Sequence, residues 1–195
     1  MSIPTLTTSR LVLRAPADAD LDALAGYEAD AEAMRFIGDG SVHDRDHAEQ
    51  TLAGFLAEWP RLGHGRWSVA LRATGETIGN CGFVRWREGE DDARPELAYG
   101  YARAAWGQGY ATEAASAALA WAFATLPFVE VVAMTHPANA ASQRVLAKLG
   151  FAPAGEVVPA HGRRLSFFRL PRERHVALTE RMPMIGRTGP SADGG

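Results

Sequence analysis

The chain has 195 residues, a mass of 20.9 kDa and a formal net charge of −3. Apolar residues make up 47% and charged residues 22%, which is ordinary for a globular protein with one packed domain, and the slightly acidic balance argues against nucleic-acid binding driven by overall charge. The single cysteine, Cys81, excludes an intrachain disulfide, and no apolar run reaches the length of a membrane-spanning helix.

The first residues of the chain lack the basic-then-apolar order of a secretion signal. With a single cysteine in the chain, this start favours a reducing compartment. We therefore expect a cytoplasmic protein, a monomer or a homodimer, with neither a membrane nor a nucleic acid as its partner.

The N-terminal third contains signals for one strand and two helices. Residues 11–14 form a short apolar run that indicates a strand, and Pro16 ends it. Asp18 can cap the helix that follows, because apolar residues recur after it at helical spacing. A second helix is predicted over residues 44–59, with its end at Pro60.

The middle of the chain indicates antiparallel strands. Residues 67–86 alternate on both sides of a Thr-Gly-Glu turn, which predicts a β-hairpin. Residues 96–102 follow as another strand with its larger side chains on one face. On the other face Ala98, Gly100 and Ala102 are small, which leaves room for a close approach.

The C-terminal part returns to alternating helices and strands. An alanine-rich helix is predicted to end near Thr125, followed by a buried strand over residues 129–134 and a helix over residues 139–149. A hairpin around His161 closes the domain, and residues 187–195 have the composition of a disordered tail. Because a helix connects two of these strands, at least one pair should be parallel, within a mixed sheet covered by helices.

The segment 96–113 carries the clearest chemical signal. A strand enters a turn with Gly107 and Gly109, and the turn opens a helix whose first amide groups and dipole favour an anion such as a diphosphate. A dinucleotide fingerprint needs a third glycine where Thr112 stands, and a phosphate-binding Walker loop needs a lysine, whereas the only lysine is Lys148. A turn that needs glycine for its geometry alone remains the competing interpretation.

A second motif follows the next strand and favours the anion-binding interpretation of the glycine turn. The chain here resembles the GNAT N-acetyltransferase superfamily. Its sequence around the glycine turn is similar to that of the ribosomal-protein N-terminal acetyltransferase (RimJ/RimL-like) branch. The resemblance covers roughly residues 8 to 172. The residues that match the two motifs of the superfamily are Trp106, Gly109 and Ala111 in the first, and Asn139, Ser142, Lys148, Gly150 and Phe151 in the second.

The resemblance implies a single GNAT-like α/β (α+β) domain over residues 8–172, followed by an extension over residues 173–195. The fold would be a mixed, mostly antiparallel sheet of about seven strands with about four helices, in which a splayed parallel strand pair binds acyl-CoA. Acetyl-CoA would be the co-substrate, without a metal ion. The resemblance places its binding residues at Tyr99, Tyr101, Ala102, Trp106, Gly107, Gln108, Gly109, Tyr110, Ala111, Thr112, Asn139 and Ser142.

The chain departs from the family pattern at two positions. Trp106 stands where the superfamily usually has Gln or Arg, and Leu146 stands where many members place the tyrosine that protonates the leaving thiolate. The resemblance to the ribosomal-protein branch instead implies that Ser142 hydrogen-bonds the leaving sulfur. It also makes Glu96 the candidate base, acting through a water, because Glu96 starts the strand that enters the glycine turn, where the family often has a carboxylate near the acceptor. The competing interpretations are a serine that bonds its own helix backbone and a glutamate at the surface.

The remaining candidates have weaker patterns. Cys81 has no basic neighbour in sequence, so a buried structural thiol is expected rather than a nucleophile. His43 and His47 have a spacing that suits a metal pair but lie among charged residues typical of a solvated helix face. His161 would line the acceptor side or simply occupy a turn.

The sequence thus predicts an acetyl-CoA-dependent N-acetyltransferase. It would transfer the acetyl group directly, in a ternary complex, to a protein N-terminal α-amine or a small amine. The alternatives are another acyl donor such as succinyl-CoA, for which Arg35 or Arg85 would be the residues to inspect, and a CoA-binding module without turnover.

Overall fold

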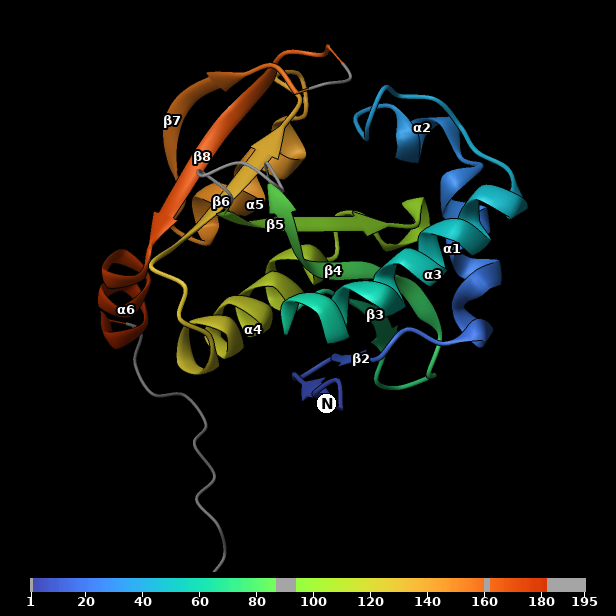
Figure 1. Ribbon diagram of the computed structural model, residues 1–195, viewed down its shortest axis with the longest axis horizontal. Helices are drawn as coiled ribbons and strands as arrows, with labels where there is room; N and C mark the ends of the chain where they lie inside the picture. The colour runs from blue at the N-terminus through green and yellow to red at the C-terminus, as the bar shows by residue number, and fades with distance from the viewer. Residues whose placement is uncertain (1, 87–93, 160–161, 182–195) are drawn as a thin grey trace, which may run out of the picture.

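The computed structural model describes residues 2–86, 94–159 and 162–181 (Figure 1). The tip of the last predicted hairpin at His161 and the predicted tail at residues 187–195 lie outside these residues. Within the described residues an 8-stranded sheet has the order β1-β2-β3-β4-β5-β6-β8-β7, and all neighbours are antiparallel except β5 and β6. The predicted mixed, mostly antiparallel sheet is therefore confirmed. The strands are β1 (Leu6–Thr7), β2 (Leu11–Arg14), β3 (Arg66–Leu71), β4 (Thr77–Trp86), β5 (Arg94–Tyr101), β6 (Glu130–Thr135), β7 (Ala152–Val157) and β8 (Leu165–Pro171).

Helices connect and cover these strands. They are the 3-10 turns η1 (Asp18–Asp20) and η2 (Arg103–Ala105) and the helices α1 (Leu21–Glu28), α2 (Ala31–Met34), α3 (Arg45–Leu62), α4 (Tyr110–Thr125), α5 (Ala140–Lys148) and α6 (Arg172–Arg181). The short elements β1 and α2 escape prediction because neither is long enough to show a period. None of the helices in the described part of the chain combines the length and apolar character that a bilayer crossing requires.

The main hydrophobic core lies between the sheet and α4. Alternate residues of a strand point to opposite faces, and most of the larger apolar side chains of β3, β4 and β5 point to the α4 side. The helix meets them with alanines that are fully buried, which allows a close approach. The buried residues at this contact include Trp67, Val69, Cys81, Phe83 and Leu97 on the sheet, and Ala114, Ala115, Ala118 and Ala122 on the helix. Burial of each large side chain contributes roughly 1.5–3 kcal/mol.

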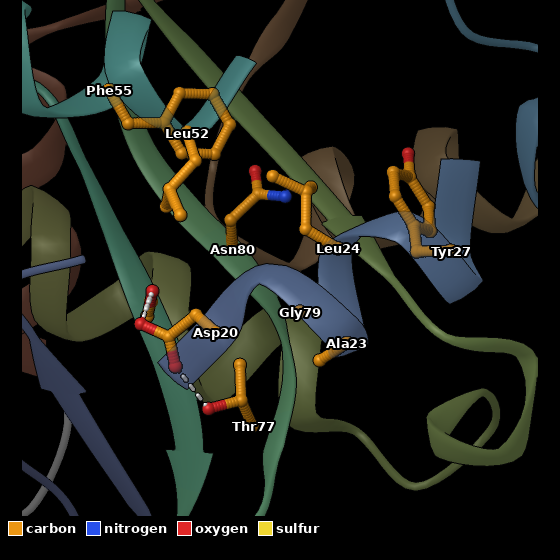
Figure 2. Close-up of a pocket in the computed structure, with 10 residues that line it drawn as sticks. Asp20, Ala23, Leu24, Tyr27, Leu52, Phe55, Thr77, Gly79 and Asn80 are labelled. Atoms are coloured by element: carbon orange, nitrogen blue, oxygen red, sulfur yellow. Dashed lines mark hydrogen bonds between the residues drawn. The ribbon is translucent and has the colours of Figure 1, made fainter. Parts of the chain in front are cut away.

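The opposite face of the sheet carries polar side chains and lies beneath α1 and α3. These two helices form a separate apolar cluster that includes Leu24, Leu52 and Phe55. Figure 2 shows Asp20 and Asn80 beneath this cluster, next to a small cavity of about 20 Å³. The sheet therefore has one face that supplies the core and another that can present polar groups to a ligand.

Asp20 anchors this second layer to the sheet. Its carboxylate accepts hydrogen bonds from Arg14 at 2.6 and 2.8 Å. It also accepts from the Thr77 hydroxyl at 2.6 Å and from the Ser68 hydroxyl at 2.7 Å, and Figure 2 draws these two bonds as dashed lines. Burial alone would raise the pKa of Asp20, but these donors outweigh it and lower the pKa to about 2. The carboxylate thus fixes the start of α1 over the sheet as a permanently charged group.

The end of α3 differs from its prediction. The helix continues through Pro60 to Leu62 instead of ending at the proline, and Gly63 caps it with a φ of 72°. Proline lacks an N–H, so Pro60 removes one helical hydrogen bond in the last turn. The helix nevertheless keeps its direction and continues to Leu62. The Gly63 N–H donates to the Trp59 carbonyl at 2.9 Å, which completes the turn.

The strands β5 and β6 separate soon after they meet. Their parallel pairing has one registered pair, Glu96 with Val132, although β5 continues to Tyr101 and β6 to Thr135. In Figure 1 the two strands point in clearly different directions beyond this place. The predicted splayed pair is therefore present, and it leaves an open edge in the middle of the sheet.

Candidate active site

Two adjoining cavities lie where β5 and β6 separate. The first, here the glycine-loop cavity, has a volume of about 460 Å³ and is lined by the turn before α4 and by one side of α5. The second, here the Glu96 cavity, has a volume of about 370 Å³ and contains Glu96 and Arg66. The residues that line both are Tyr27, Phe36, Ile37, Tyr99, Gly100, Asn139 and Ser142. Molecules bound in the two cavities would meet at these shared residues.

The glycine loop presents to the first cavity the amide groups that precede the first hydrogen bond of α4. Gly107 and Gly109 have φ values of 75° and 81°, which side chains disfavour, and Gly109 is the N-cap of α4. The first hydrogen bond of the helix runs from the Glu113 N–H to the Gly109 carbonyl. The amides of Tyr110, Ala111 and Thr112 therefore precede the helical ladder and remain available, at the positive end of the helix dipole, for an anion.

Glu113 holds this loop against the N-terminal strands. Its carboxylate accepts hydrogen bonds from the Thr8 hydroxyl at 2.6 Å and from the Arg10 side chain at 2.7 Å. Burial opposes the charge, but these donors, with the Ser9 hydroxyl and the Arg10 N–H, lower the pKa of Glu113 to about 2. Arg10 also donates to the Gln108 carbonyl at 2.9 Å, so the loop is fixed before any ligand binds.

The open edge of β5 supplies further donors. The Ala102 N–H donates to the Ile78 carbonyl of β4 at 3.0 Å, and the direction of N–H groups alternates along an antiparallel strand. The N–H groups of Tyr99 and Tyr101 therefore face the opening, whereas that of Ala102 is occupied. The Tyr101 carbonyl accepts from the Trp106 indole at 2.8 Å, so Trp106 braces the edge. Ala102 and Gln108, both predicted to bind the cofactor, do not line the glycine-loop cavity.

Ser142 lies at the junction of the two cavities. Its side-chain oxygen is 2.8 Å from that of Tyr99, and its backbone N–H donates to Asn139 at 3.0 Å. Asn139 is the N-cap of α5, as its position in the motif suggests. Burial raises the pKa of Tyr99 to about 12, although the hydrogen bond with Ser142 lowers it in part, so the phenol stays protonated at neutral pH.

Glu96 lies at the point where the strands begin to separate. Burial raises the pKa of its carboxyl to about 7 from 4.5, and the positive charge of Arg66 opposes this rise in part. A carboxyl with such a pKa exchanges protons readily at neutral pH, which suits a general base. The structure thus places Glu96 in one cavity, the glycine loop in the other and Ser142 between them.

A comparison with known families assigns this arrangement. The family model described as an acetyltransferase (GNAT) domain matches residues 10–152. The chain belongs to the GNAT acetyltransferase family. The predicted N-acetyltransferase is confirmed at this level.

Related proteins support the same family. The Bacillus subtilis protein named "Uncharacterized N-acetyltransferase YoaA" is 30% identical over 78% of this chain and 85% of its own length. The crystal structure of an acetyltransferase from Agrobacterium tumefaciens is 33% identical, with a TM-score of 0.73 over 87% of this chain and 95% of that chain. RimL, a ribosomal alpha-N-protein acetyltransferase solved in complex with coenzyme A, shares the fold with a TM-score of 0.71 over 86% of this chain and 98% of its own, at 15% identity.

GNAT enzymes use acetyl-CoA, and the residues of the glycine-loop cavity fit this molecule. The loop amides suit its pyrophosphate, and the open edge of β5 offers N–H donors to a flexible amide-containing arm. Arg144 and Lys148 also line the cavity from α5, four residues apart, where they can meet a phosphate. Arg144 escapes sequence prediction, but its spacing from the motif lysine on one helix face indicates it in retrospect.

The Glu96 cavity contains polar residues that no sequence motif marks. Tyr27, Arg66 and Asn80 come from α1, β3 and β4 and converge only because the sheet brings them together. A Cβ at Gly100 would lie 2.4 Å from the Tyr27 hydroxyl, so the close approach expected over the small face of β5 is that of Tyr27. Leu146, which replaces the family tyrosine, is buried and lines this cavity without a polar group.

The remaining candidate residues lie in surroundings that favour a structural role over a catalytic one. Cys81 is fully buried, and burial raises the pKa of its thiol to about 12, which fits the expected structural thiol. The His43 and His47 rings stack at 3.8 Å, and His47 Nδ1 lies 2.8 Å from the buried Glu28 carboxylate. Among the described residues no group of three or more His, Cys, Asp or Glu side chains could hold a metal ion. Arg35 and Arg85, the arginines considered for another acyl donor, are exposed and line neither cavity.

Proposed function

We propose that the protein transfers an acetyl group from acetyl-CoA to a primary amine, either a protein N-terminal α-amine or a small amine, by direct attack in a ternary complex. The observation that carries this proposal is the junction of the two cavities at Tyr99, Gly100, Asn139 and Ser142. The donor and the acceptor can enter from opposite sides and meet there without a covalent enzyme intermediate. The buried, protonated thiol of Cys81 offers no nucleophile for one.

Glu96 would remove the proton that the amine must lose. At pH 7 an α-amine with a pKa near 8 costs only about 1.4 kcal/mol to deprotonate, whereas a lysine-type amine costs about 4.6 kcal/mol. A carboxyl with a pKa of about 7 can accept this proton directly or through a water. Of these two acceptors, the α-amine therefore needs the least help from Glu96 to lose its proton.

Groups at the junction would stabilise the negative charge that develops on the carbonyl oxygen and on the sulfur. As the amine nitrogen bonds the carbonyl carbon, the oxygen becomes anionic, and the outward N–H of Tyr99 can stabilise it. When the carbon–sulfur bond breaks, the hydroxyl pair of Ser142 and Tyr99 can donate a hydrogen bond to the thiolate. The proton released by the amine finally neutralises that thiolate.

A free-thiol release assay tests this function. Acetyl-CoA is supplied with peptides that differ in their first residue, amino acids, polyamines and aminoglycosides, and succinyl-CoA is run in parallel. We expect release that depends on the acceptor and is faster with acetyl-CoA. Binding of acetyl-CoA in calorimetry without acceptor-dependent release would instead indicate a CoA-binding module, and faster release with succinyl-CoA would indicate another acyl donor.

A further inference from the structure

Arg66 is a partly buried cation on the acceptor side that the proposed chemistry does not use. It is the first residue of β3 and pairs with Gly82 of β4, which in turn pairs with Ala98 of β5. Glu96 is two residues from Ala98 and points to the same face of the sheet. Because Gly82 has no side chain, nothing from the strand between them separates Arg66 from Glu96.

The guanidinium of Arg66 is held in place, but no carboxylate of the described residues forms an ion pair with it. It lies over the Phe55 ring of α3, with 4.5 Å from its central carbon to the ring centre. Its Nε is buried without a hydrogen-bond partner, and Arg66 forms no ion pair with another described residue. Buried polar groups are rarely left unsatisfied, and a guanidinium matches an oxyanion with its fork of donors.

The carboxylates near Arg66 do not supply this oxyanion. Glu58, Glu96 and Glu28 are close enough for their charge to raise the pKa of Arg66 against the lowering by burial, but none of them forms an ion pair with it. Glu28 is engaged with His47 instead. The cavity therefore has a cationic end at Arg66 and an acidic side at Glu96.

Asn80 adds a neutral donor on the same face. It is only 6% exposed and lines the Glu96 cavity next to the row of Arg66 and Gly82. In Figure 2 its amide is drawn among the pocket residues near Leu24 and Leu52, with which it lines the small cavity. Its side chain makes no hydrogen bond to another described residue, so the amide is available to a ligand.

We propose that the acceptor carries an oxyanion, such as a carboxylate, close to its primary amine, with Arg66 binding the oxyanion while Glu96 receives the amine. This inference rests on the proposed acetyl transfer to an amine. Arg66 lines the Glu96 cavity but not the glycine-loop cavity, through which the acyl donor enters. We therefore assign the oxyanion to the acceptor and not to the acyl group. A free amino acid and a peptide with an acidic first residue share this chemistry.

Matched acceptors test the inference in the wild-type protein itself. Each free α-amino acid is compared with its amide, and each peptide that begins with Asp or Glu is compared with the peptide that begins with Asn or Gln. We expect kcat/KM to be about 10- to 100-fold higher for the carboxylate form in one of the two series, which also identifies the source of the oxyanion. Equal values in both series, with turnover present, would overturn the inference and leave the acetyltransferase proposal standing.

Variants assign the preference to Arg66. Arg66→Met should reduce the carboxylate-to-amide ratio of kcat/KM toward one, mainly through KM of the acceptor, and Arg66→Lys should restore part of it. Arg85→Met is the matched control, because it removes the same charge from an exposed position outside both cavities. Folding is checked by circular dichroism and by the Kd for acetyl-CoA.

Three results would contradict the assignment. A wild-type ratio that persists in a folded Arg66→Met variant would place the anion elsewhere. An equal loss of the ratio in Arg85→Met would mean that the preference depends on the overall charge of the protein and not on Arg66. A preference for succinyl-CoA over acetyl-CoA that Arg66→Met abolishes would assign the guanidinium to the acyl group. Absence of turnover with every acceptor would contradict the proposed function first.

Discussion

The hydroxyl oxygens of Tyr99 and Ser142 lie 2.8 Å apart, although one residue is in β5 and the other in α5. Either hydroxyl can be the donor. Because the pKa of Tyr99 is raised to about 12, its phenol keeps a proton and can donate to Ser142, which leaves the serine hydrogen free for a third atom. We propose that the pair takes the role of the tyrosine that many members of the family have at the position of Leu146.

Replacement of this pair should slow the chemical step more than it weakens binding. We predict that Ser142→Ala lowers kcat about 10- to 100-fold with a smaller change in KM for acetyl-CoA, because the lost hydrogen bond is needed when the thiolate leaves. The backbone N–H that caps α5 with Asn139 is retained in this variant. Steady-state kinetics measures the effect.

A double-mutant cycle shows whether the two hydroxyls act together. Tyr99→Phe should have a smaller effect than Ser142→Ala, and the double variant should be little slower than the single serine variant, because each hydroxyl acts through the other. Purely additive losses, or a change in KM alone, would mean that the serine binds the substrate and does not act on the sulfur.

Glu96 should give the reaction its pH dependence. With a pKa of about 7, the carboxyl is protonated and idle as a base in acid, so the rate advantage of the wild type over Glu96→Gln should be small near pH 5.5 and reach its full size above about pH 7.5. An ordinary glutamate, with a pKa near 4.3, would give a constant ratio over this range. Rates of both proteins across pH distinguish the two cases.

The stability of the same variant provides an independent readout. The folded-state pKa of Glu96 is raised above 4.5, so the folded protein binds the proton more tightly than the unfolded chain does. Its contribution to stability is present in acid and is lost as the pH rises from about 4.5 through about 7. We expect Glu96→Gln to gain stability relative to the wild type over that interval, as followed by urea unfolding; a constant difference would contradict the raised pKa.

Local chemistry explains how much of this site the sequence could predict. The glycine loop, Asn139 and Ser142 act through backbone geometry and capping within a few residues, so their motifs are visible in the chain. Glu96 could be proposed because it begins the predicted strand over residues 96–102 that enters the loop, although β5 itself begins at Arg94. The crossover helix between two strands predicts a mixed sheet with a parallel pair, and the resemblance adds the GNAT-like architecture.

The rest of the site depends on contacts between distant segments. Arg66, Tyr27 and Asn80 come from separate elements, and only the strand register places them on one face of the sheet. The resemblance includes Ala102 among the backbone groups that hold the cofactor arm, and the alternation of the β-ladder directs its N–H to Ile78. Such parity cannot be known before the neighbouring strand is known.

Gly109 should be essential for acetyl-CoA binding for a reason beyond backbone strain. Gly109→Val forces a β-branched residue to a φ of 81° and adds a side chain beside the amides that would hold the phosphates. We predict an affinity for acetyl-CoA at least about 10-fold weaker, together with a destabilisation of about 1–2 kcal/mol from the strained backbone. Calorimetry and thermal unfolding measure the two effects.

Gly75→Val separates these effects. Gly75 has a φ of 76° with nothing near its added Cβ, and it lies in the turn between β3 and β4 away from both cavities. It should lose similar stability without losing affinity. Unchanged affinity in folded Gly109→Val, or an equal loss in Gly75→Val, would show that the loop is not the phosphate site.

Asp20 should make the fold sensitive to acid through a group far from the chemistry. Its side chain is 4% exposed, and its pKa is lowered to about 2 from 3.8, so its stabilising effect is complete above about pH 4 and is lost as the pH falls through about 2. We predict that Asp20→Asn destabilises the protein by about 3 kcal/mol at pH 7, because Arg14 is left without its carboxylate, and that this difference shrinks between about pH 4 and pH 2. Asp18→Asn, at an exposed position in the same turn, is the matched control and should change stability by less than about 0.5 kcal/mol. Urea unfolding over this pH range decides the matter, since a difference that stays constant would mean that Asp20 acts through its shape and hydrogen bonds and not through its charge.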